Sequence, residues 1–226
     1  MDRLTVSEIF GPTLQGEGPS AGKVATFLRL GGCNLTCTWC DTPYSWDFRP
    51  GSPYSAATEL QKRSIAEVAT AIGRPKLLVV TGGEPMLQQA GIVALLDVLP
   101  MCDIEIETNG TIPPDPALAD SVRFNVSPKL THAKTEPMVF SSLLAFAELY
   151  TATFKWVVQT ADDVGDVVTL AADLGVPLGR VMVMPEGRTS EEWHARLPEI
   201  AEAAVLHGVR VSPRLHLDIW GTKRGH

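Results

Sequence analysis

Three of the four cysteines lie close together in the sequence GGCNLTCTWCDT. Cys33, Cys37 and Cys40 have the spacing C-x-x-x-C-x-x-C, which suits one loop around a single metal centre. A zinc site would need a fourth ligand, whereas a 4Fe–4S cubane held by three thiolates would keep one iron open. Trp39 favours the cluster, because a bulky apolar neighbour shields it from water. The loop therefore predicts a cluster, with a zinc staple or three metal-free thiols as alternatives.

Three further motifs each follow a strand-like run. TGGEP at 81–85 has two glycines that permit close backbone approach, and Pro85 suits the first turn of a helix. SPK at 127–129 and MPEG at 184–187 take the same place after later strands. Alone, TGGEP is equally typical of an ordinary strand-to-helix turn. Together with the cysteine loop, the shared position predicts one site at the carboxyl ends of several strands.

The elements that must position these motifs alternate between strand and helix. We expect strands at 24–30, 77–81, 103–108, 122–127, 153–158 and 180–184. We expect helices at about 58–73, 86–99, 138–149, 161–174 and 190–207. This alternation implies a parallel sheet with right-handed crossovers. Six strands fall short of a full barrel, so the predicted fold is α/β, an incomplete TIM-like (β/α)6 barrel, with a doubly wound open sheet as the alternative.

The composition of the chain limits the classes of protein to which it can belong. The chain has 226 residues, 45% of them hydrophobic, and 19 Lys and Arg against 26 Asp and Glu give a net charge of −7. This balance excludes a broad basic face for nucleic acid. We expect no membrane span and no secretory signal, and therefore a cytoplasmic protein. We also expect one domain over 1–226, with an N-terminal hairpin extension (about 1–22) and a C-terminal tail (about 209–226). Cys102 is assigned to structure.

The cysteine loop resembles the signature of the radical S-adenosylmethionine (SAM) superfamily, whose members carry a 4Fe–4S cluster in a full or partial barrel. LQGEG at 14–18, Arg29, ETNG at 107–110 and WGTKRG at 220–225 narrow the resemblance to the 7-carboxy-7-deazaguanine synthases. This family implies a lyase of 7-deazapurine (queuosine) biosynthesis. It converts 6-carboxy-5,6,7,8-tetrahydropterin to 7-carboxy-7-deazaguanine with release of ammonia.

The resemblance also implies roles for individual residues. Those matching substrate contacts are Leu14, Gln15, Gly16, Glu17, Arg29 and Thr81. Those matching SAM contacts are Gly83, Glu84, Ser127, Pro128, Lys129, Met184, Pro185, Glu186 and Gly187. Those matching metal ligands are Cys33, Cys37 and Cys40 for the cluster and Thr42 for Mg2+. The guanidinium of Arg29 suits a substrate carboxylate. No residue is implied as an obligatory catalytic base, and Glu107 is a candidate near the substrate.

Partners and alternatives follow from the same resemblance. It implies a flavodoxin or ferredoxin as reductant and a homodimer, for which Phe140, Trp193 and Trp220 are interface candidates. In some members the terminal carboxylate reaches the pterin, and the resemblance leaves open whether His226 enters the site. His216 could approach the substrate, although its place in an alternating stretch favours a structural histidine. One alternative is an activase that installs a glycyl radical on another protein, against which LQGEG and Arg29 argue. The other is a non-enzymatic iron–sulfur or zinc-stapled module, for which motifs at four strand ends are unnecessary.

Overall fold

A nine-stranded sheet forms the centre of the protein in the computed structural model, which describes residues 2–99 and 101–226. The strands are β1 (Arg3–Leu14), β2 (Val24–Leu30), β3 (Gln61–Ser64), β4 (Leu77–Gly82), β5 (Asp103–Thr108), β6 (Arg123–Val126), β7 (Ala152–Val158), β8 (Val181–Pro185) and β9 (Arg210–Val211). Their order is β3-β1-β2-β4-β5-β6-β7-β8-β9. All neighbours from β2 to β9 are parallel. The order ends at β3 and β9 within the described residues, which confirms an incomplete α/β barrel.

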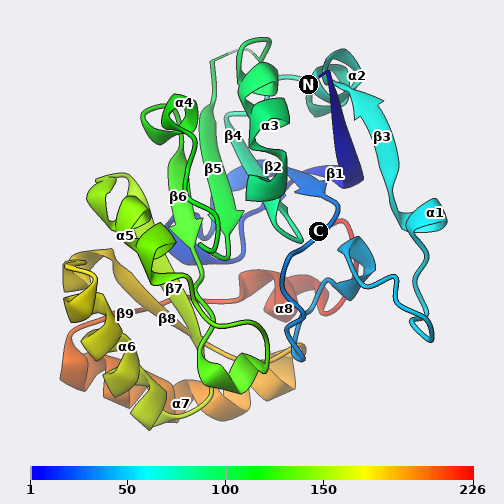
Figure 1. The fold of residues 1–226 in the computed structure, drawn as a ribbon. Helices are drawn as coiled ribbons and strands as arrows, with labels where there is room; N and C mark the ends of the chain where they lie inside the picture. Colours follow the sequence, from blue (N-terminus) through cyan, green and yellow to red (C-terminus); the bar gives the residue numbers. More distant parts are fainter. Residues whose placement is uncertain (1, 100) are drawn as a thin grey trace.

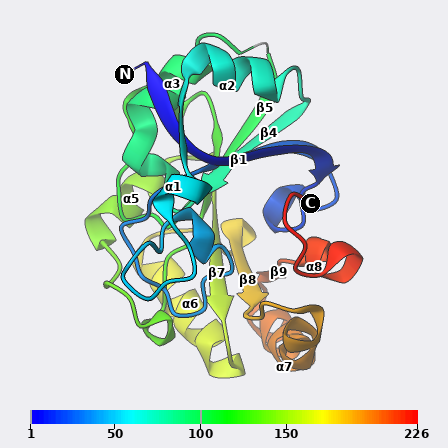
Figure 2. The same cartoon turned by 90° about the vertical axis from the view of Figure 1, so that its right-hand side faces the viewer.

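Helices cover one face of this sheet (Figures 1 and 2). The helices are α1 (Ala56–Glu59), α2 (Ile65–Ile72), α3 (Gln89–Leu96), α4 (Pro116–Ala119), α5 (Phe140–Glu148), α6 (Ala161–Asp173), α7 (Ser190–His207) and α8 (Leu215–Trp220). Helix α8 lies close to the chain's C-terminal end, and its Asp218 accepts a hydrogen bond from Ser190 of α7 (Figure 2). No helix of the described residues has the length and apolarity needed to cross a bilayer.

The helix predicted over 58–73 is wrong in its first half. Residues 61–64 instead form β3, which pairs antiparallel with residues 3–6 of β1. Ser64 then caps α2 by accepting a hydrogen bond from the Glu67 N–H, while the Glu67 side chain accepts from the Ser64 N–H. This capping box starts the helix at Ile65, so its first turn cannot extend back into the strand. The short elements α4, α8 and β9 were not predicted.

The N-terminal extension predicted over about 1–22 is part of the sheet from residue 3 onward. Its strand β1 pairs antiparallel with both β2 and β3. Met1 lies outside the described residues. Residues 3–14 of the extension form this strand, which lies between β3 and the parallel strands.

Side chains along the strands alternate between the hydrophobic core, which faces the helices, and the opposite face of the sheet, which lines a cavity. Successive side chains of a strand point to opposite faces of the sheet. The side chains of one set are buried in the main hydrophobic core: Leu28, Leu78, Ile106, Phe124, Trp156 and Val183. Their neighbours along the same strands line a cavity: Arg29, Thr81, Glu107, Asn125, Lys155 and Met184. The same pleat therefore supplies both the core and the site.

We expect Phe124→Ala to lower the free energy of unfolding by about 3–5 kcal/mol. Phe124 is fully buried, and its ring packs edge-on against Phe146 with centroids 5.2 Å apart. Urea unfolding of the cluster-free protein measures the change. Val205→Ala is the control, since Val205 is 83% exposed, and it should change stability by no more than about 0.5 kcal/mol. Equal losses in the two variants would contradict this account of the core.

Candidate active site

A cavity of about 230 Å³ lies at the carboxyl ends of the parallel strands. Sixteen of the nineteen predicted ligands line it: Leu14, Gln15, Gly16, Glu17, Arg29, Cys33, Cys37, Cys40, Thr42, Thr81, Gly83, Ser127, Lys129, Met184, Glu186 and Gly187. Glu84, Pro128 and Pro185 do not line the cavity in the described structure. The four motif regions and the N-terminal LQGEG segment thus meet at one place, while the ligand assigned to each residue stays a prediction.

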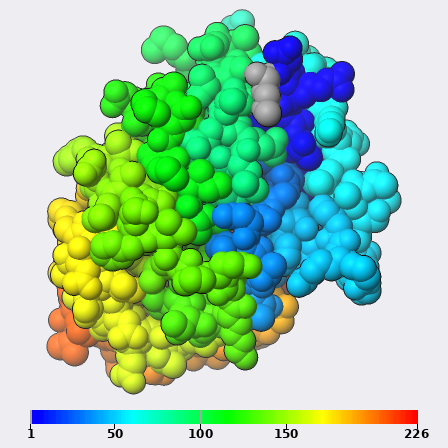
Figure 3. Space-filling model, viewed as in Figure 1, coloured from blue at the N-terminus to red at the C-terminus, as the bar shows by residue number. Residues whose placement is uncertain are grey.

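The cysteine loop, residues 31–42, is tied to the loops that follow two other strands. The Thr36 N–H donates to Thr135 Oγ1 (2.8 Å), and the side chain of Asn109 donates to Asn34 Oδ1 (3.0 Å). In the space-filling view, this loop reaches the surface beside the segment that follows β6 (Figure 3). These contacts hold the loop against the sheet without using its thiols.

The three thiols of the loop fit a cluster better than a single metal ion. Cys33, Cys37 and Cys40 are free and half-buried. Among the described residues, no three His, Cys, Asp or Glu side chains are arranged to hold one ion. A cubane takes one thiolate at each of three irons, so its ligands need not converge on a point. The described residues thus show no preformed site for a single ion, and a donor set of three cysteines suits a 4Fe–4S cluster.

Two of these sulfurs accept hydrogen bonds, and burial changes the pKa of two of the thiols. Cys40 Sγ accepts a hydrogen bond from Trp46 Nε1 (3.3 Å), and Cys33 Sγ accepts one from the Leu35 N–H (3.4 Å). Burial raises the pKa of the Cys33 thiol to about 11 and also raises the pKa of Cys37. Both thiols are therefore protonated at neutral pH until a metal displaces the proton.

Gly83 lets the TGGEP turn pack directly against the cysteine loop. A Cβ at this position would overlap the Gly32 carbonyl and the Cys33 side chain. The two segments are also joined by a hydrogen bond from the Glu84 N–H to the Gly32 carbonyl (2.8 Å). Glycine is therefore required here for close backbone approach.

The Glu84 side chain holds the loop after β5 and does not face the cavity. Its carboxylate accepts hydrogen bonds from the Met86 N–H (2.9 Å), Thr108 Oγ1 (2.8 Å) and the Asn109 N–H (2.7 Å). Burial raises the pKa of this carboxyl, and the three donors oppose the rise.

Arg29 is a rigidly held cation on the cavity wall. Its Nε donates to Glu8 Oε1 (3.1 Å), which also accepts a hydrogen bond from the Tyr44 hydroxyl (2.6 Å). The guanidinium lies over the Phe10 and Tyr44 rings, at 5.8 and 5.9 Å from their centroids. Burial lowers the pKa of Arg29, but Tyr44 and Glu8 outweigh it and raise the pKa. Within the described residues its two Nη groups have no protein hydrogen-bond partner, which leaves them for a ligand carboxylate.

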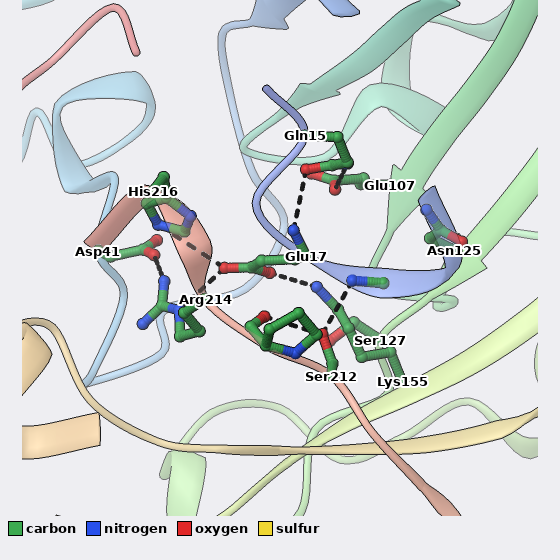
Figure 4. A network of polar contacts seen from close by, with 12 residues as sticks. Gln15, Glu17, Asp41, Glu107, Asn125, Ser127, Lys155, Ser212, Arg214 and His216 are labelled. Atoms are coloured by element: carbon green, nitrogen blue, oxygen red, sulfur yellow. Dashed lines mark hydrogen bonds and ion pairs between the residues drawn. The ribbon is translucent and has the colours of Figure 1, made fainter. Parts of the chain in front are cut away.

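A chain of ion pairs crosses the cavity (Figure 4). Arg214 Nε donates to Glu17 Oε1 (2.9 Å), and Arg214 also pairs with Asp41. Lys155 pairs with the other oxygen of Glu17, and His216 Nε2 lies 3.9 Å from Oε1. Burial opposes ionisation of Glu17, but these cations prevail and hold the pKa of its carboxyl well below its usual range. Glu17 is therefore an anion at neutral pH.

A second carboxyl group, that of Glu107, lies beside Gln15 of the LQGEG segment. Gln15 Nε2 donates to Glu107 Oε1 (3.0 Å), and both residues line the cavity. A Cβ on Gly16, between Gln15 and Glu17, would overlap the His216 ring. Close packing of the LQGEG segment against α8 therefore depends on this glycine.

Among the cavity residues that were not predicted ligands are Asp41, Asn125, Lys155 and Arg214. Lys155 carried a usable signal, because a lysine inside the apolar run TFKWVV must face away from the core. Arg214 carried none, because its partner Glu17 is 197 residues away. Thr42 lines the cavity with Oγ1 3.8 Å from Cys40 Sγ, while the neighbouring Asp41 carboxylate is engaged by Arg214.

We expect Glu17→Gln to lower the free energy of unfolding at pH 7 by about 3–5 kcal/mol, because Lys155 and Arg214 lose a buried counter-charge. The pKa of Glu17 is lower in the folded chain than in the unfolded one. Its pairing therefore stabilises the fold above the unfolded value, about 4.3, and is lost as pH falls through the folded pKa.

Urea unfolding at stepped pH tests this linkage. The difference between wild type and Glu17→Gln should be constant from about pH 8 to pH 6 and shrink only below about pH 4. Glu202→Gln, at an exposed helix position, is the control and should change stability by about 0.5 kcal/mol or less. A difference that grows on acidification would show that the Glu17 pairs do not stabilise the fold.

Comparison of the chain with known proteins identifies the family to which it belongs. The model of the Radical SAM superfamily matches residues 28–197. A 7-carboxy-7-deazaguanine synthase of Pyrobaculum aerophilum is 42% identical over 99% of this chain and 97% of its own. Proteins of the same name from Hyperthermus butylicus and Bacillus subtilis are 36% and 28% identical, over 95% and 98% of this chain and 92% and 98% of their own. The crystal structure of QueE from Escherichia coli, 23% identical, superposes with a TM-score of 0.69 over 93% of both chains, which shows a shared fold.

Proposed function

Because the chain belongs to the radical SAM superfamily and to its 7-carboxy-7-deazaguanine synthases, we propose that it converts 6-carboxy-5,6,7,8-tetrahydropterin to 7-carboxy-7-deazaguanine, releasing ammonia. This is a lyase reaction of queuosine biosynthesis. Membership of the superfamily implies a 4Fe–4S cluster and SAM. One observation of the structure carries the proposal: the three clustered thiols and the cation Arg29 line the same cavity.

The cysteine loop would hold the cluster through Cys33, Cys37 and Cys40. When bound, cluster and SAM together supply a radical that removes a hydrogen atom from the substrate. The chain's own contribution is to bind and orient the reactants and to exclude water. For SAM, the cavity offers the Gly83 turn, the hydroxyl and ammonium of Ser127 and Lys129, and the loop around Gly187.

The opposite wall would bind the pterin. Arg29 would take the substrate carboxylate through its two Nη groups, in the bidentate geometry that guanidinium favours. The carboxylates of Glu17 and Glu107 would accept hydrogen bonds from ring N–H groups, because both oxygens of a carboxylate are acceptors. Gln15 and Thr81 would complete the contacts with a neutral amide and hydroxyl.

Magnesium is a further part of the proposal. Thr42 would give the ion one hydroxyl oxygen, with the substrate carboxylate and waters filling the other positions. Mg2+ often keeps several waters and takes few protein ligands, so a single threonine is compatible with its chemistry. The ion would hold the carboxylate between Thr42 and Arg29 and offset its charge.

Two partners are also proposed, a flavodoxin or ferredoxin that supplies electrons and a second copy of this chain. Among the residues named for a dimer interface, Phe140 is 43% exposed. Trp193 is only 5% exposed and packs inside the protein, so it is not available for an interface.

The experiment is an anaerobic assay of the reconstituted protein with SAM, a reductant, Mg2+ and the carboxypterin, followed by mass spectrometry. We expect 7-carboxy-7-deazaguanine, in a yield that falls when Mg2+ is removed. Formation of 5′-deoxyadenosine without this product would mean that the substrate is wrong. Absence of both, with an intact cluster, would overturn the enzyme assignment. The same assay separates the proposal from the alternative of a glycyl-radical activase, which would not convert the pterin.

A further inference from the structure

One buried arginine joins the loops around the cavity. Arg214, the residue before α8, donates from Nε to Glu17 Oε1 (2.9 Å) and from its two Nη groups to the Gly187 carbonyl and the Asp41 carboxylate. The backbone N–H of the next residue, Leu215, donates to the Gly16 carbonyl at 3.0 Å. Only 5% of the Arg214 side chain is exposed, and its partner Glu17 is 15% exposed, whereas Asp41 at the rim is 46% exposed.

Each partner of Arg214 belongs to a different functional segment. Glu17 lies in the LQGEG segment on the substrate side, and Asp41 lies between the last cluster cysteine, Cys40, and Thr42. Gly187 ends the MPEG motif on the SAM side. A guanidinium is planar, with its donors in a fixed fork, so one side chain sets the relative position of all three segments. Figure 4 shows Arg214 between Asp41 and Glu17.

We infer that Arg214 is a positioning residue that keeps these three segments in register, so that the radical forms beside the substrate's reacting carbon. The identity of the substrate rests on the proposed function, whereas the contacts of Arg214 do not. Without this side chain, each segment keeps its own ligands but loses its position relative to the others. A misplacement of about 1 Å costs up to ~10²-fold in rate. The expected defect is therefore uncoupling, in which SAM is cleaved without product.

The variants are Arg214→Met, which removes all three contacts, and Arg214→Lys, which keeps the charge but loses the fork. Arg180→Met is the matched control, because Arg180 also donates to several backbone carbonyls, among them those of Leu149 (2.6 Å) and Ala152 (2.7 Å), but does not line the cavity. We expect 5′-deoxyadenosine formed per product to rise about tenfold or more in Arg214→Met and less in Arg214→Lys. Arg180→Met should keep the wild-type ratio even if its melting temperature falls.

Hydrogen exchange of the cluster-free chain gives a readout independent of turnover. In both Arg214 variants, segments 14–18 and 41–45 should exchange faster together, whereas Arg180→Met should loosen only residues around 146–152. The inference would be overturned if a folded Arg214 variant kept the wild-type ratio of 5′-deoxyadenosine to product. Faster exchange in only one of the two segments would also overturn it. If the wild type itself cleaves SAM without forming product, the proposed substrate fails, and the exchange experiment still decides the role of Arg214.

Discussion

We expect Cys37→Ala to abolish both SAM cleavage and product formation, because a 4Fe–4S cluster needs a thiolate at each of three irons and the loop would keep only two cysteines. The thiol lines the cavity, and no other described cysteine is close enough in the fold to replace it: Cys102 packs against the helix-side core. The loop should keep its shape, since its anchors to Asn109 and Thr135 do not involve sulfur. The loss is therefore one of chemistry and not of folding.

Iron and sulfide analysis, the visible absorption of the cluster and the deoxyadenosine assay measure this outcome. Cys102→Ala is the matched control, because its thiol is also free but lies away from the cavity. It should keep wild-type iron content and turnover. A Cys37→Ala protein that retains a full complement of iron and forms product would refute the assignment of this loop as the cluster site.

Arg29→Ala should lower kcat/KM for the carboxypterin by about 10²- to 10³-fold. The substrate carboxylate would lose its charged partner in a shielded cavity, which costs about 2–5 kcal/mol at ~1.4 kcal/mol per factor of ten. Arg29→Lys should recover only part of the loss, since an ammonium is a point charge without the planar fork. The fold should persist, because Tyr44 still donates to Glu8 when the guanidinium is gone.

A pterin without the carboxylate separates this role from a general defect. Wild type and Arg29→Ala should turn it over equally poorly if the guanidinium acts on the carboxylate. Arg63→Ala, at the exposed edge strand β3, is the control and should retain wild-type kinetics. If Arg29→Ala loses as much activity on the decarboxylated analogue as on the true substrate, the clamp assignment is wrong.

The parallel strands could be predicted from local sequence, whereas the edge strand could not. The predicted bounds 24–30 and 103–108 agree with β2 and β5, because VATFLRL is largely apolar and DIEIET alternates polar and apolar residues with the period of a strand. Helix α7 also begins and ends as predicted, after the Thr189 cap. Strand β3 depends on pairing with residues 3–6, far away along the chain, and its polar residues carry no signal of that pairing.

The active site likewise has one part that local sequence predicts and one part that it does not. Motif residues could be located because each follows a strand, and parallel strands bring their carboxyl ends to one edge. The electrostatic network around Glu17 could not, because it joins the N-terminal segment, β7 and the residue before α8. Such pairs depend on three-dimensional packing. Of the residues in this network, Lys155 is the one whose sequence context, a single charge within an apolar run, indicates that its side chain faces away from the core.

The contacts of Arg214 also set an order of events during translation. The cysteine loop leaves the ribosome early, but the arginine that fixes Asp41 follows 173 residues later, and the same arginine fixes Glu17 after 197. The nascent chain can build the strands from β2 to β8 while these acidic groups still lack that partner. The cavity is complete only when the segment leading into α8 has emerged.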